Sequence, residues 1–123
     1  MTTMQPEIDN LVERARKAQQ NYEASGTQER FDRAAQAAAW ALMEPTRNAE
    51  LAAFAVAETG LGNSADKITK NHRKTLGLLR DIKGQKSFGL VDDNPASGVS
   101  EFLRPKGVVA AIVPSTNPLA TPV

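Results

Sequence analysis

GVVAAIVPSTNP, residues 107–118, is the stretch that decides how this sequence of 123 residues is interpreted. Its first seven residues, 107–113, are apolar without interruption and are followed by a Pro-Ser-Thr-Asn-Pro turn. Such a run predicts a β-strand that is buried on both faces, as in a parallel sheet. A parallel partner strand needs a crossover of about a dozen residues or more, usually through a helix. Because only five residues follow Pro118, we expect the chain to begin an α/β unit that it does not complete, as the first piece of a larger protein.

Two helices are predicted at the start of the chain from their apolar spacing. The first begins near Pro6, where a first helical turn tolerates proline, and ends at Ser25-Gly26. Thr27 can cap the second helix, which Pro45 closes. Trp40, on a second face of this helix, is expected in the core.

Two further helices are predicted before residue 85. The third, from about 49 to 58, is apolar on nearly all sides and stops at Gly60, so it is expected to be the most buried helix. Phe54 on this helix is expected in the core. Ser64 can cap the fourth, which ends near Gly84. The apolar stripe expected along this fourth helix consists of Ile68, Thr75, Leu76 and Leu79.

Between residues 86 and 105 the helical period disappears. Residues 89–91 and 99–103 are predicted as short strands, and residues 92–98 between them have the composition of a turn. A β-hairpin is therefore expected between the helices and the final apolar run.

Three blocks of this sequence resemble aldehyde dehydrogenases, and the resemblance runs from about residue 8 to the end. Residues 107–118 are similar to the segment that opens the nicotinamide-binding domain, in the Ser-Thr-Asn-Pro form of the coenzyme-A-acylating branch. Residues 51–60 are similar to the family helix that ends in Glu-Thr-Gly. Residues 66–72, DKITKNH, resemble the Asp-Lys-x-x-Lys-Asn-His block of the acylating branch. Within that branch, residues 72–80 look most like sulfoacetaldehyde dehydrogenases.

The resemblance implies an α/β fragment: about four N-terminal helices, a β-hairpin, and the first strand of an incomplete nicotinamide-binding Rossmann-like domain. Residues 1–84 would be the helical region of the cofactor-binding domain. Residues 85–105 would form a hairpin arm that holds subunits together in a homo-oligomer. Residues 106–123 would supply the first strand and the motif turn.

The resemblance also assigns site residues and partners. In the family a cysteine thiolate attacks an aldehyde, hydride passes to NAD or NADP, and coenzyme A takes the acyl group. By resemblance Asn117 donates its side-chain amide to the oxyanion, and Val113, Pro114, Ser115 and Thr116 contact the nicotinamide cofactor. From spacing alone, Asn117 is better explained as a turn former between Thr116 and Pro118 than as a catalytic residue.

Composition limits the chemistry that the chain can perform alone. It has no cysteine, which excludes disulfides, thiolate metal sites and a cysteine nucleophile. We therefore expect the chain by itself to be inactive. A net charge of +1 and the absence of a long apolar segment or signal peptide predict a cytoplasmic protein with no nucleic-acid or membrane partner. A lone His72 does not predict a metal site.

A basic stretch at residues 65–86 leaves a second function open. It contains seven Lys or Arg against two Asp, which suits either an anion site or a solvated helix face. Lys67, Lys70 and Lys74 lie at helical spacing, as a solvated face requires. The alternative to a dehydrogenase is a free-standing helical interaction module whose basic helix binds an anionic partner.

Overall fold

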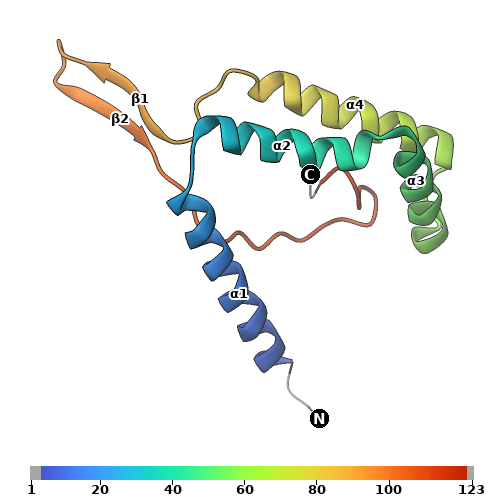
Figure 1. The fold of residues 1–123 in the computed structure, drawn as a ribbon. Helices are drawn as coiled ribbons and strands as arrows, with labels where there is room; N and C mark the ends of the chain where they lie inside the picture. The colour runs from blue at the N-terminus through green and yellow to red at the C-terminus, as the bar shows by residue number, and fades with distance from the viewer. Residues whose placement is uncertain (1–3, 122–123) are drawn as a thin grey trace. The chain divides into compact units, whose positions relative to one another are not determined.

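A computed structural model describes residues 4–121, and these form four helices and one two-stranded sheet (Figure 1). The elements in chain order are α1 (Gln5–Ala24), α2 (Gln28–Met43), α3 (Pro45–Thr59), α4 (Ser64–Ile82), β1 (Gly89–Asn94) and β2 (Val99–Leu103). The predicted helices, hairpin and α/β fragment are confirmed. Among the described residues, 4–30 and 86–110 form one compact unit, and 31–85 with 111–121 form a second.

The first three helices begin and end at the expected signals, with one correction. Thr27 Oγ1 accepts the backbone N–H of Arg30 at 3.1 Å at the start of α2. Gly60, with φ +64°, ends α3 in the left-handed conformation that favours glycine. The correction concerns Pro45, which opens α3 as well as closing α2, because Glu44 accepts the N–H groups of Thr46 at 3.1 Å and Arg47 at 2.8 Å.

The predicted cap of α4 is wrong by one residue. Asn63 is the N-cap, since its Oδ1 accepts the backbone N–H of Asp66 at 2.9 Å, and Ser64 is the first helical residue. Asn63 also donates from Nδ2 to the Asp66 carboxylate at 2.6 Å. The Asn63 amide makes both bonds at once, because its oxygen accepts and its nitrogen donates.

The core of the second unit is small and partly polar. Its buried apolar residues are Ala39, Leu42, Ala52 and Ala55, and its buried polar residues are Asn48, Lys67, Asn71 and Thr75. Helices α3 and α4 pack against each other, as Figure 1 shows. The expectation that Trp40 and Phe54 lie in the core is wrong, because they are 61% and 62% exposed. Alanines on the same helices occupy the packed positions, which brings the backbones close and leaves the large rings outside.

The hairpin forms as predicted, with a first strand that is longer than expected. β1 and β2 pair antiparallel, from Gly89 opposite Leu103 to Asn94 opposite Val99. The register shifts between Leu90 and Asp92, as a β-bulge does. At the turn, Asn94 Oδ1 accepts the N–H groups of Ala96 and Ser97 at 3.1 and 3.2 Å.

The predicted buried strand at 107–113 is wrong for this chain. These residues form no strand and are exposed, with Val109 at 74% and Ile112 at 98%. The physical reason is the absence of a partner: the two strands within residues 4–121 pair with each other, and none is left for the apolar run. The Rossmann-like assignment is therefore not confirmed by this structure.

Candidate functional site

Asn117 lies half-buried in the motif turn, and both its backbone and its side chain make hydrogen bonds. Its backbone N–H donates to the Pro114 carbonyl at 3.1 Å, which closes the turn. Its Nδ2 donates to Thr121 Oγ1 at 3.0 Å. Its Oδ1 is enclosed and has no hydrogen-bond partner among the described residues. The turn-forming interpretation is thus supported by a hydrogen bond, and the side chain is also held in one orientation.

The other predicted site residues lie along the same turn and are more open. Val113 is 39% exposed, and Pro114, Ser115 and Thr116 are exposed as well. The Thr116 carbonyl accepts the Lys70 ammonium at 2.8 Å. This hydrogen bond joins the predicted cofactor segment to the basic helix α4 across 46 residues of sequence, and no local sequence pattern predicts it.

A cavity of about 250 Å³ lies where the turn meets α4. It is lined by residues 61–63 of the α3–α4 loop, by Asp66, Lys67 and Lys70 of α4, and by Thr116. Its charged groups are two lysines and one aspartate. A cavity of this size and charge can hold a small anionic group.

Lys67 lies in this cavity with most of its side chain buried, which differs from the prediction of a solvated helix face. It is 5% exposed, so the solvated-face interpretation is wrong for Lys67, while it fits the exposed Lys74. The end of its stem runs below the α3–α4 loop, since Lys67 Cε lies 3.8 Å from where a Cβ on Gly62 would stand. Within residues 4–121, Lys67 makes no hydrogen bond or ion pair through its ammonium group.

A pair of buried amides holds α3 against α4 beneath this region. Asn71 Nδ2 donates to Asn48 Oδ1 at 2.9 Å, and Asn48 Nδ2 donates to the Ile68 carbonyl at 3.1 Å. Neither residue of this pair is among the site residues predicted from the sequence. The available signal was the spacing of Lys67, Asn71 and Thr75, which repeats every four residues and places polar groups on one helical face.

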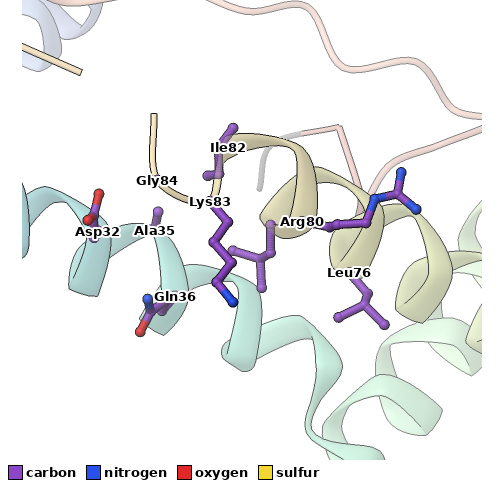
Figure 2. A pocket seen from close by; sticks show the side chains of 9 residues that line it. Asp32, Ala35, Gln36, Leu76, Arg80, Ile82, Lys83 and Gly84 are labelled. Carbon is purple, nitrogen blue, oxygen red and sulfur yellow. The ribbon is translucent and has the colours of Figure 1, made fainter. Parts of the chain in front are cut away.

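A second cavity, of about 480 Å³, lies between α2 and the C-terminal half of α4. Figure 2 shows Asp32 and Gln36 on the α2 side and Leu76 and Arg80 on the α4 side. Leu76 was expected in the apolar stripe, but it is 49% exposed because it borders this open groove. The groove contains none of the predicted site residues.

The described residues limit other kinds of site. Within residues 4–121 no group of three or more His, Cys, Asp or Glu side chains is placed to hold a metal ion, and His72 is exposed. None of the helices in that range combines the length and apolar character needed to cross a bilayer.

Comparisons with known proteins identify relatives along almost the whole chain, although no family model matches it. The chain is 59% identical over 91% of its length to a sulfoacetaldehyde dehydrogenase (acylating) of Cupriavidus necator, and it covers 22% of that protein. It is 46% identical over 93% of its length to the Bilophila wadsworthia protein of the same name, covering 24% of it. It is 39% identical over 94% of its length to the bifunctional aldehyde-alcohol dehydrogenase AdhE of Escherichia coli K12, covering 13%. The chain thus spans about a quarter or less of these relatives, and the match lies in their N-terminal part. The chain therefore belongs to the aldehyde dehydrogenase superfamily and corresponds to an N-terminal portion of its coenzyme-A-acylating branch.

Proposed function

We propose that the chain is part of an acylating aldehyde dehydrogenase, which oxidises an aldehyde to its acyl-coenzyme A while NAD or NADP is reduced. The observation that carries this proposal is the 59% identity over 91% of the chain to a protein named for that reaction. Because two of the relatives at 59% and 46% identity share the name, we propose sulfoacetaldehyde as the aldehyde. The proposed location is the cytoplasm.

In the proposed enzyme the parts of this chain have separate tasks. Residues 1–84 form the helical region of the cofactor-binding domain, and residues 85–105 form the arm that holds subunits together in a homo-oligomer. Residues 106–123 form the first strand and motif turn of the nicotinamide-binding domain. The exposure of Val109 and Ile112 supports this last assignment, since apolar side chains of a β-prone run gain stability only when other strands cover them.

Asn117 is the proposed oxyanion donor. A side-chain amide nitrogen carries two N–H groups, and the bond to Thr121 uses one of them. The second remains to stabilise the negative oxygen that forms when a thiolate adds to the aldehyde carbonyl. The bond to Thr121 fixes the direction of that second N–H before the reaction, which is what an oxyanion site requires.

The backbone of Val113 to Thr116 is proposed to hold the nicotinamide cofactor. These residues fit such a role because the segment is exposed and unpaired with any strand within residues 4–121. The cofactor, when bound, accepts the hydride. The nucleophile must come from outside these 123 residues, since they include no cysteine, so the isolated chain is proposed to be inactive.

The test replaces Asn117 by Ala in the full-length protein that carries this chain. We expect turnover of sulfoacetaldehyde with coenzyme A to fall roughly a hundred- to a thousandfold, the typical loss for one oxyanion donor. Binding of NAD or NADP should be nearly unchanged, because its contacts here are from backbone groups. Asn21→Ala makes the same substitution at an exposed position of α1, outside the proposed site residues, and is the matched control that should retain turnover. Turnover of the Asn117 variant within about threefold of the parent, at equal stability, would contradict the role of Asn117.

A further inference from the structure

We propose that Lys67 and Lys70 form a binding site for one tetrahedral oxyanion, a phosphate or sulfonate group, in the cavity between the α3–α4 loop and the motif turn. The site itself rests on the geometry of this chain. Only the molecules that would supply the oxyanion rest on the proposed function. They are the substrate, through its sulfonate end, or a cofactor, through a phosphate.

The unpaired burial of Lys67 is the first observation. Only 5% of its surface is exposed, and within residues 4–121 no acceptor or carboxylate is bonded to its ammonium. Its ammonium nitrogen is not among the enclosed polar atoms that lack a partner within residues 4–121, so the stem is buried while the charged end stays open to a ligand. The residue lines the cavity, so an anion bound there would supply the missing partner.

Lys70 supplies a second positive charge on the same wall. Its ammonium has three N–H groups, and the bond to the Thr116 carbonyl at 2.8 Å uses one and holds the group at the cavity. Two donors remain. The Asp66 carboxylate also lines the cavity, but the Asn63 amide engages it at 2.6 Å. Two ammonium groups against one carboxylate leave the cavity positive.

The start of α4 adds to the same field. Residues 64–66 form its first turn, whose partial positive charge favours an anion. The cap uses the Asp66 and Lys67 N–H groups, which Asn63 accepts with Oδ1 and its carbonyl. A group with three acceptor oxygens can take bonds from Lys67 and Lys70 together and still face this turn. A carboxylate, with two oxygens, offers fewer acceptors.

The experiment titrates the complete 123-residue chain with two probes, inorganic phosphate and ethanesulfonate. Binding is followed by isothermal titration and by NMR shifts of the Gly62 and Asn63 amides, with sodium chloride added to keep the ionic strength constant. We expect saturable binding by the parent chain. Lys67→Met and Lys70→Gln should each raise the Kd roughly tenfold or more, the loss expected for one charge-assisted hydrogen bond. Lys74→Gln makes the same change of charge one helical turn beyond Lys70 and should leave the Kd unchanged.

The outcomes test separately whether the anion site exists, which natural ligand it binds, and whether the proposed activity is correct. Tighter binding of ethanesulfonate supports the site and indicates the substrate, and tighter binding of phosphate supports it and indicates a cofactor. Absence of saturable binding by the parent chain, or equal weakening in Lys74→Gln, would overturn the site. If Lys67→Met failed to fold, Lys70→Gln would decide. Turnover is not measured, so an inactive full-length protein would refute the proposed function and leave this result unaffected.

Discussion

Replacing Asn71 by Ala tests the buried amide pair that joins α3 to α4. Asn71 is 2% exposed and donates to Asn48 Oδ1 at 2.9 Å. The change leaves Asn48 Oδ1 buried without its donor, and an unsatisfied buried polar atom costs about 1–3 kcal/mol. We expect the free energy of unfolding to fall by about that amount. Urea denaturation followed by the helical circular-dichroism signal measures it.

The double variant Asn48→Ala with Asn71→Ala distinguishes a specific hydrogen bond from a general loss of packing. Removing both amides leaves neither partner unpaired, so its cost should be smaller than the sum of the single costs by about 1–3 kcal/mol. Thr75→Val is the control on the same buried face. Its Oγ1 is enclosed with no hydrogen-bond partner among the described residues, so its removal should cost nothing. Single costs that add to within about 0.5 kcal/mol would refute the coupling of the two amides.

Two further predictions concern the glycines of the helices and the N-cap of α3. Gly60→Ala should destabilise the chain by about 1–2 kcal/mol, because φ is +64° there. Gly77→Ala inside α4 should stabilise it by about 0.5–1 kcal/mol, because a new Cβ would have nothing within 4 Å. Thermal denaturation that gave both changes the same sign would contradict this. The N–H groups of Arg47 and Thr46 lower the pKa of Glu44 below its ordinary value of 4.5, so the cap stabilises α3 fully above that value and is lost as pH falls through the lowered pKa. Glu44→Gln should therefore reduce the loss of helicity on acidification, and identical circular-dichroism pH curves for variant and parent would show that the cap is not responsible.

The local structure was predictable where a single residue type determines the backbone. Gly60 and Thr27 marked helix ends, and the turn composition at 92–98 marked the hairpin. The burial pattern was not predictable in the same way. Counting apolar residues placed Trp40 in the core, whereas close helix packing selects small residues and excludes a large ring. The strand at 107–113 was predicted from propensity, but a strand also needs a partner to pair with.

The residues of the candidate site could be predicted from sequence motifs, but their burial and their contacts in space could not. The resemblance indicated Asn117 and residues 113–116, and the turn around Asn117 followed from its composition. The burial of Lys67 could not be inferred, because a lysine at helical spacing among other charges usually faces solvent. The bond from Lys70 to Thr116 joins residues far apart in the chain, and no local pattern encodes such a contact.

The bond between Lys70 and Thr116 has a consequence for how the motif turn acquires its position. Closing a loop of 46 residues costs about 3 kcal/mol or more in chain entropy. One hydrogen bond from a charged donor stabilises the closed loop by only about 1.5–3 kcal/mol. The bond cannot close this loop alone, and it persists because the helices between its ends are already folded. The hydrogen bond between Lys70 and Thr116 is then expected to form late in folding and to open early. Substitutions that loosen α3 from α4 will displace Asn117 without touching it.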